Sequence, residues 1–119
     1  MKVLITGING QDGSYLSELL LERGHRVHGI LKRNSVAENQ SARIEHIFKD
    51  LELEYADMLD MASLIRVIQL VKPDEIYNLA SQSHVRISFD QPIYTSQVVG
   101  LGVLNLLESV RLTDKNIKV

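Results

Sequence analysis

The sequence contains no cysteine, and no apolar run approaches the roughly 18–20 residues that cross a bilayer. Without cysteine, neither disulfides nor thiolate metal sites can hold the fold, which excludes small disulfide-stapled secreted domains. Only four residues separate Met1-Lys2 from Gly7, too few for a signal peptide. We therefore expect a protein without a membrane partner, compatible with the reducing cytoplasm.

An excess of charge of one sign is also missing. The chain has 13 basic and 15 acidic residues, for a formal net charge of −2. A nucleic-acid surface normally carries a basic excess, so no nucleic-acid partner is expected. With 45% hydrophobic and 24% charged residues, the 119-residue chain falls in the ordinary globular class and has room for one domain.

What the sequence does contain is a regular alternation of strand and helix signals. Apolar runs predict strands at 2–6, 26–31, 53–58 and 75–80, with 117–119 as the start of a fifth. Helical patterns begin at Ser14, near Arg43, after an N-cap at Asp60 and after Pro92. Such alternation implies a parallel sheet. The sequence thus predicts an α/β, Rossmann-type doubly wound domain over residues 1–119, truncated near its fifth strand and without a substrate domain.

The turn after the first predicted strand carries the strongest functional signal. Gly7, Gly10 and Gly13 have a G-x-x-G-x-x-G spacing between a strand and a helix. One glycine permits a tight turn, another lets a pyrophosphate approach the backbone, and a third lets the helix pack close to the sheet. Exposed amides and the helix dipole favour phosphate there. The pattern indicates a dinucleotide site, with an ordinary glycine-rich turn as the alternative.

The end of the second predicted strand indicates which dinucleotide binds. Sites for NAD usually place an acid about 20 residues beyond the glycines, on the ribose 2′-hydroxyl. Here Lys32 and Arg33 stand in that region, and no acid occurs before Glu38. Basic side chains can pair with a 2′-phosphate, which a carboxylate would repel. NADP is therefore expected over NAD, although two basic residues could instead simply solvate a loop.

Two further segments leave predicted strands at the sheet edge where ligands of this architecture bind. Asp57 could accept a hydrogen bond from adenine or be an ordinary surface carboxylate. Small Ala80 and Ser81 would let the backbone approach a nicotinamide ribose. His84 is a candidate base, but no carboxylate nearby in the sequence orients it, which favours a structural or substrate-edge role.

Several segments together closely resemble the GDP-mannose 4,6-dehydratases, a branch of the extended short-chain dehydrogenase/reductases. They are Ile-Thr-Gly-Ile-Asn-Gly-Gln-Asp-Gly-Ser-Tyr-Leu at 5–16, Val-His-Gly-Ile at 27–30 with Lys32 and Arg33, Arg-Ile-Glu-His at 43–46, Lys-Pro-Asp-Glu-Ile-Tyr-Asn-Leu at 72–79, and Gln-Ser-His-Val at 82–85 with Ser88 and Phe89. The resemblance implies a lyase that converts GDP-D-mannose to GDP-4-keto-6-deoxymannose and recycles NADP in each turnover. It also implies homotetramers, through the segment 33–43.

The resemblance also implies roles for individual residues. The pyrophosphate cradle would comprise Gly7, Ile8, Asn9, Gly10, Gln11 and Asp12, with Gly13 completing the glycine motif. Arg33 would hold the 2′-phosphate, and Asp57 and Met58 stand where the family has Asp-Leu near adenine. The nicotinamide side would be lined by Leu79, Ala80, Ser81, Gln82 and Ser83, with Tyr94 as a further cofactor contact. Two departures are Lys32 and Asn34 in place of Arg and Ser, and Ala80-Ser81 in place of Gly-Ala.

Family catalysis uses a Thr, a Glu and a Tyr-x-x-x-Lys pair, all beyond the fifth strand. None of the four tyrosines in this chain has a lysine four residues later. No catalytic residue and no metal ligand is therefore expected within 1–119, since the base and its lysine are missing. Two alternatives stay open: the front of another extended-family enzyme, such as a nucleotide-sugar reductase or epimerase, and a non-catalytic NADP(H)-binding module.

Overall fold

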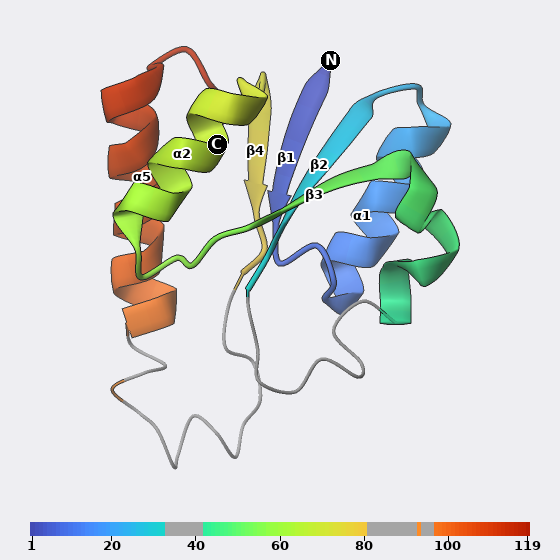
Figure 1. The fold of residues 1–119 in the computed structure, drawn as a ribbon, viewed down its shortest axis with the longest axis horizontal. Coiled ribbons are helices and arrows are strands. Elements are labelled where there is room, and N and C mark those ends of the chain that lie inside the picture. Colours follow the sequence, from blue (N-terminus) through green and yellow to red (C-terminus); the bar gives the residue numbers. More distant parts are fainter. Residues whose placement is uncertain (33–41, 81–92, 94–96) are drawn as a thin grey trace.

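A wholly parallel, four-stranded sheet forms the centre of the computed structural model, with strand order β3-β2-β1-β4 (Figure 1). The structure describes residues 1–32, 42–80, 93 and 97–119. The strands are β1 Lys2–Thr6, β2 Arg26–Leu31, β3 Leu51–Tyr55 and β4 Glu75–Asn78. The helices are α1 Gln11–Glu22, the 3₁₀ helix η1 Ala42–Asp50, α2 Met61–Val71, the short π-helix η2 Gln97–Leu101 and α5 Gly102–Thr113.

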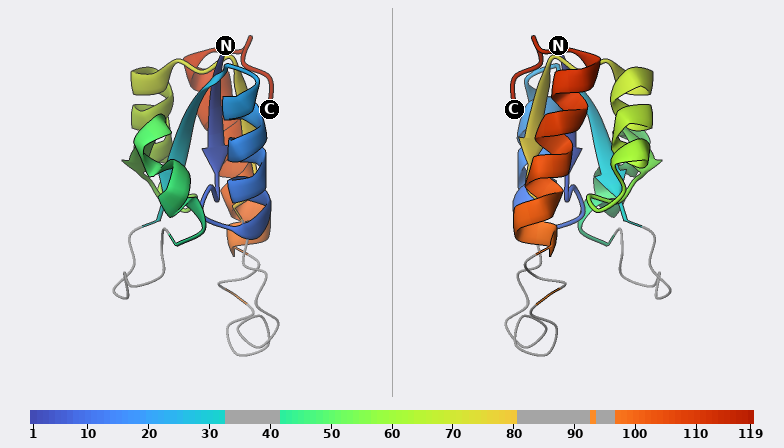
Figure 2. Two further views of the ribbon diagram at one scale, coloured as in Figure 1. Left: turned by 90° about the vertical axis from the view of Figure 1, so that its right-hand side faces the viewer. Right: turned by 90° about the vertical axis from the view of Figure 1, so that its left-hand side faces the viewer.

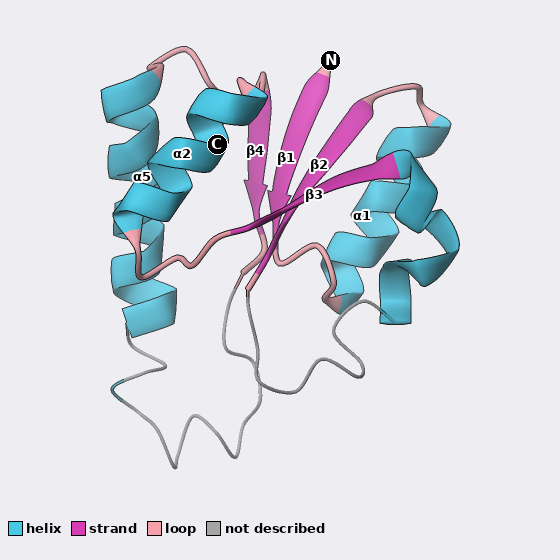
Figure 3. Ribbon diagram, in the orientation of Figure 1, coloured by secondary structure: helices cyan, strands magenta, loops and turns pink. Residues whose placement is uncertain are grey.

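Helices cover both faces of this sheet, which confirms the doubly wound α/β prediction. Figure 3 shows α2 and α5 on one side of the strands and α1 and η1 on the other. The two faces have separate cores: Leu4, Ile30 and Ile76 face buried side chains of α2 and α5, whereas Val3 and Ile5 face those of α1 and η1. A central strand buried on both faces needs a continuous apolar run, as Val3–Ile5 provides.

The two termini lie at the same end of the molecule, beside the amino ends of the strands (Figure 2). Lys118 makes a single parallel bridge to Glu75, on the outer edge of β4. This contact agrees with the strand start predicted at 117–119. No helix in the described ranges is both long and apolar enough to cross a membrane.

Two strand boundaries differ from the sequence prediction. The third strand occupies Leu51–Tyr55 rather than 53–58, because the Asp57 amide donates to the Ser63 hydroxyl at 3.1 Å and the chain turns there. The fourth ends at Asn78 rather than at residue 80, because the Ala80 amide bonds to the Thr6 hydroxyl, while the Leu79 amide is shared between that hydroxyl at 3.1 Å and the Thr6 carbonyl at 3.2 Å. In both places a side chain satisfies backbone groups that a longer strand would have used.

The first and third helices also differ in detail from the prediction. Helix α1 begins at Gln11, three residues before the predicted Ser14. Asp60 occupies the N-cap position of α2, but its carboxylate makes no capping hydrogen bond. The turn before α2 is instead held by the Ser63 hydroxyl, which donates to the Asp60 carbonyl at 2.7 Å. A local pattern therefore located each helix but not the hydrogen bonds at its start.

His28 is a buried titratable side chain in β2, on the face that also carries Leu4 of β1 and Glu52 of β3. The Glu52 carboxylate lies 2.8 Å from its Nε2, yet that nitrogen makes no hydrogen bond within the described residues, so the contact is out of line. Burial is the largest influence on the pKa of His28 and lowers it. The nearby charges of Arg26 and Lys2 also lower this pKa, whereas Glu52 and Glu54 raise it. The folded protein therefore favours the neutral imidazole.

We expect this burial to make the fold less stable as the pH falls. The unfolded chain takes up the His28 proton near its ordinary pKa of about 6.5, whereas the folded chain takes it up only at lower pH, so the free energy of unfolding drops below about pH 6.5. His28→Gln removes this contribution. Urea denaturation from pH 8 to pH 5 should show that the difference in the free energy of unfolding between wild type and variant becomes smaller as the pH falls. A difference that does not change with pH would mean that His28 contributes to stability through packing alone and not through its protonation.

Candidate functional site

The candidate site lies at the carboxyl ends of the strands, where the turns after β1, β3 and β4 leave the sheet (Figure 1). Gly7 opens the first of these turns with a φ of +69°. A Cβ at Gly7 would stand 2.7 Å from the Leu79 carbonyl oxygen and 2.8 Å from the Ala80 nitrogen. The glycine loop is therefore pressed against the backbone that leaves β4, which brings together two segments predicted to serve one site.

The first turn of α1 closes on the same loop. A Cβ at Gly13 would stand 2.3 Å from the Gly7 carbonyl oxygen, and the Gly10 amide donates to that oxygen at 3.0 Å. The N-cap residue of α1 is Gly10, which has no side chain with which to cap the first turn. The helix N-terminus thus presents backbone amides beside glycines that carry no obstructing Cβ, and this arrangement fits the pyrophosphate of a dinucleotide.

Ile8 is fully buried, so its contribution to the loop is a backbone one. Its side chain packs over Gly29 in the middle of β2, where a Cβ would come within 2.4 Å of Ile8 Cδ1. No role was predicted for Gly29 from the sequence. An isolated glycine inside an apolar strand indicates that another group approaches the backbone closely, so this contact could have been predicted from the sequence.

Thr6 joins the carboxyl ends of β1 and β4 and was also given no role. Its buried hydroxyl donates to Asn78 Oδ1 at 2.6 Å and accepts the amides of Leu79 and Ala80, both at 3.1 Å. One side chain thus fixes the backbone of the predicted nicotinamide side next to the glycine loop. Nothing in a single sequence marks a threonine for contacts with residues more than 70 positions away.

Asp57 and Met58 form the turn after β3, the predicted adenine end. Asp57 is half-buried, and one carboxylate oxygen is engaged by the Leu59 amide. Met58 is only 6% exposed and packs in the core between the sheet, α2 and α5. A cofactor contact at this turn would therefore involve the Asp57 carboxylate and the backbone of Met58 rather than the methionine side chain.

The remaining predicted site residues divide into two groups. Gln11 and Asp12 are exposed in the first turn of α1, and Asn9 is half-buried in the loop before it. The other predicted positions lie outside the described residues; they are Arg33, Ser81, Gln82, Ser83, His84 and Tyr94. Of the basic pair at the end of β2, the structure describes Lys32, which is exposed.

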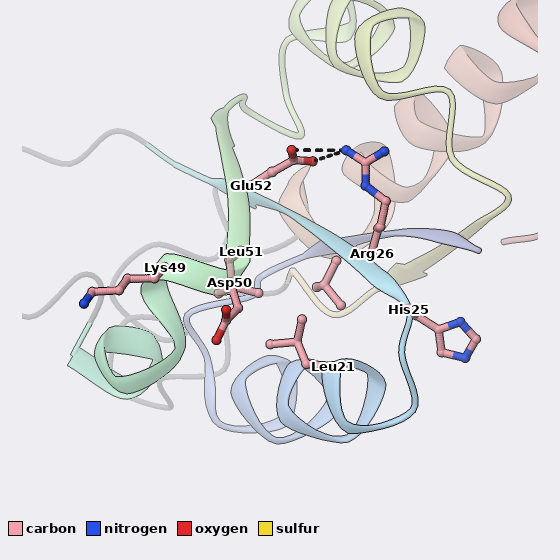
Figure 4. Close-up of a pocket in the computed structure, with 8 residues that line it drawn as sticks. Leu21, His25, Arg26, Lys49, Asp50, Leu51 and Glu52 are labelled. Carbon is pink, nitrogen blue, oxygen red and sulfur yellow. Dashed lines mark hydrogen bonds and ion pairs between the residues drawn. The ribbon is translucent and has the colours of Figure 1, made fainter.

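A hollow of about 500 Å³ lies at the opposite edge of the sheet, away from the glycine loop (Figure 4). Arg26 and Glu52 on its wall pair with each other at 3.2 Å, and His25 and Lys49 extend to opposite sides of it. It contains no predicted site residue. Across the described ranges, no group of three or more His, Asp or Glu side chains is arranged to hold a metal ion.

Comparison with known proteins identifies relatives of this chain. The profile of the GDP-mannose 4,6 dehydratase family matches residues 4–119. The GDP-mannose 4,6-dehydratase of Yersinia enterocolitica is 51% identical over 118 residues, covering 93% of this chain and 31% of the relative. The human GDP-mannose 4,6 dehydratase is 51% identical over 116 residues, covering 91% and 31%. This chain therefore spans about a third of the length of these relatives.

Solved structures share the fold at lower identity. UDP-glucose 4-epimerase of Thermus thermophilus, in complex with NAD, superposes with a TM-score of 0.80 at 30% identity, over 95% of this chain and 34% of that one. The protein Pal from Bacillus thuringiensis superposes with a TM-score of 0.82 at 26% identity, over 98% and 37%. Each comparison pairs nearly all of this chain with about a third of a longer one.

Proposed function

Because this chain belongs to the GDP-mannose 4,6-dehydratase family, we propose that its carboxyl edge holds the NADP(H) of a nucleotide-sugar dehydratase. The observation that carries the proposal is the cradle between Gly7 and Gly13, where a Cβ on either glycine would meet backbone atoms within 3 Å. Such an exclusion of side chains, next to uncapped helix amides, suits a diphosphate that must approach the backbone closely.

In this proposal the chain binds and orients the cofactor and takes no proton itself. The amides of the loop and of the first α1 turn hold the pyrophosphate, and the turn at Asp57 receives the adenine. The Thr6 hydroxyl sets the position of the backbone at Leu79 and Ala80, beside which the nicotinamide ribose would lie. When bound, the cofactor supplies a hydride acceptor. The substrate would be GDP-mannose and the product its 4-keto-6-deoxy derivative, which makes the parent protein a lyase.

The high identity to dehydratases favours this reaction over its alternatives. The curated relatives named dehydratases are about 50% identical to the chain, whereas the structure of a UDP-glucose 4-epimerase is 30% identical.

We also propose a cytoplasmic homo-oligomer, a tetramer by family resemblance. The absence of cysteine is compatible with a reducing compartment. Exposed apolar side chains on η2 and α5 would suit contact with another subunit; they are Val99, Leu101, Leu104 and Leu107.

The choice of NADP over NAD depends on Arg33. We expect Arg33→Ala to raise the Kd for NADP⁺ by roughly tenfold or more, because a charge-assisted hydrogen bond to the 2′-phosphate contributes about 1.5–3 kcal/mol. The Kd for NAD⁺ should stay almost unchanged, because NAD⁺ lacks that phosphate. Isothermal titration of wild type and variant with both dinucleotides measures the two ratios.

A matched control is Arg23→Ala, which removes the same charge at the exposed C-terminal end of α1, away from the carboxyl edge. It should leave both dissociation constants near their wild-type values. Equal weakening of NADP⁺ and NAD⁺ by Arg33→Ala would rule out a 2′-phosphate contact. Failure of the wild-type chain to bind either dinucleotide would overturn the proposed cofactor site itself.

A further inference from the structure

Helix α5 contacts the turn after β3 at two points. The side-chain amide of Asn105 donates from Nδ2 to the Met58 carbonyl oxygen at 2.8 Å. One turn earlier, Gly102 lies so close that a Cβ there would stand 3.0 Å from Met58 Cβ. The backbone and the side chain of Met58 are therefore both held by a helix that lies more than 40 residues further along the chain.

The other hydrogen bonds of this turn lie within the turn or join it to α2. The Asp57 amide donates to the Ser63 hydroxyl at 3.1 Å, and the Asp60 amide donates to the Asp57 carbonyl at 2.9 Å. The Leu59 amide engages the Asp57 carboxylate. These bonds fix the shape of the turn and attach its two ends to α2. The Asn105 bond is the polar contact that ties its centre to α5.

We propose that Asn105 is a positioning residue for the adenine end of the cofactor site. Its amide holds the Met58 carbonyl and thereby sets the direction of the Asp57 carboxylate and of the Met58 backbone, the groups available to an adenine ring. This inference rests on the proposed function, because it requires a dinucleotide at the carboxyl edge. Asn105 itself touches no cofactor in this arrangement and acts through the turn.

The chemistry of the pair explains why an amide is needed at this position. A partly buried carbonyl that loses its donor must either stay unpaired or move with the turn to find another partner, and both are unfavourable. Either outcome disturbs the adenine end, whereas the glycine loop and the end of β4 are held by separate contacts through Gly7 and Thr6. Removing the donor should therefore weaken the adenosine half of the ligand selectively.

The test compares the two halves of the cofactor. Asn105→Asp keeps the size of the side chain but replaces the donor by a carboxylate that repels the carbonyl. We expect the Kd for 2′,5′-ADP to rise about tenfold, equivalent to about 1.4 kcal/mol, and the Kd for nicotinamide mononucleotide to stay unchanged. Lowering the pH should restore 2′,5′-ADP binding relative to wild type at the same pH, because a protonated Asp can donate again.

Ser109→Ala is the matched control. Its hydroxyl is buried one turn along α5 and donates at 2.7 Å to the Asn105 carbonyl, within the helix. This variant should reduce stability and leave both dissociation constants unchanged. If Asn105→Asp weakens both halves by the same factor, or neither half, the positioning role is wrong. If wild type binds neither half, the proposed function fails instead.

A measurement on the wild-type chain covers the case in which the variant does not fold. The side-chain NH₂ resonances of Asn105 should shift, and their exchange with solvent should slow, on titration with 2′,5′-ADP, because ligand packing stabilises the turn that accepts the bond. Nicotinamide mononucleotide should produce neither change. Identical responses to the two ligands, or no response to 2′,5′-ADP at saturation, would overturn the inference.

Discussion

Gly13→Ala is expected to weaken NADP(H) binding by more than about 100-fold and to destabilise the fold by about 1–3 kcal/mol. The added Cβ would stand 2.3 Å from the Gly7 carbonyl oxygen and 2.8 Å from Ile8 Cα, both backbone atoms. No rotamer change can relieve such contacts, so α1 must move away from the loop. That movement separates the helix amides from the rest of the cradle. Isothermal titration and urea denaturation measure the two effects.

Gly100→Ala controls for the change of residue itself. Gly100 lies in η2, and a Cβ there would meet no atom of the described residues within 4 Å. This variant should bind NADP(H) as wild type does, and its stability should be equal or slightly higher, because alanine has the better helical propensity. A Gly13→Ala protein that binds NADP(H) normally would show that the close approach of α1 to Gly7 is not required for the site.

Gly7→Ala should have an effect of similar size for a different reason. Its φ of +69° costs an L-residue about 1–2 kcal/mol, and its Cβ would also come within 2.8 Å of the Leu79 and Ala80 backbone. The loop must then separate from the end of β4. We expect cofactor affinity to fall by more than about 100-fold, with a loss of stability that exceeds the backbone cost alone.

Gly24→Ala isolates the backbone cost. Gly24 lies at the end of α1 remote from the cradle and has a φ of +81°, but a Cβ there would meet no atom within 4 Å in the part of the chain that the structure describes. It should lose about 1–2 kcal/mol of stability and keep its cofactor affinity. The excess loss in Gly7→Ala over Gly24→Ala measures the contact between the loop and β4. Equal losses in both variants, with normal binding, would contradict the tight packing described for Gly7.

Local features of the sequence were sufficient to predict the architecture. The run Val3–Ile5 is apolar at every position because β1 is buried on both faces, and Gly24 takes the left-handed φ expected of a glycine that ends a helix. The spacing of Gly7, Gly10 and Gly13 located the turn between β1 and α1. Residues within a few positions of one another determine these features, so periodicity and glycine placement record them.

The third strand shows where local patterns are ambiguous. The run Leu51–Tyr55 alternates Leu with Glu because β3 is an edge strand, and that alternation is a weaker signal than a continuous apolar run. The strand ends early because its backbone turns at Asp57. The sequence also placed leucines along α5 without indicating which would be covered: Leu106 is buried, whereas Leu104 and Leu107 remain exposed.

By itself, the sequence determined the order of strands and helices, the parallel sheet and the position of the glycine turn at its carboxyl edge. The tertiary structure decided which distant groups complete that edge: the Thr6 hydroxyl on the amides after β4, Ile8 over Gly29, and Asn105 on the Met58 carbonyl. These contacts join residues from about 20 to more than 70 positions apart. They depend on strand order, register and helix rotation, which arise only when the two cores pack against the sheet.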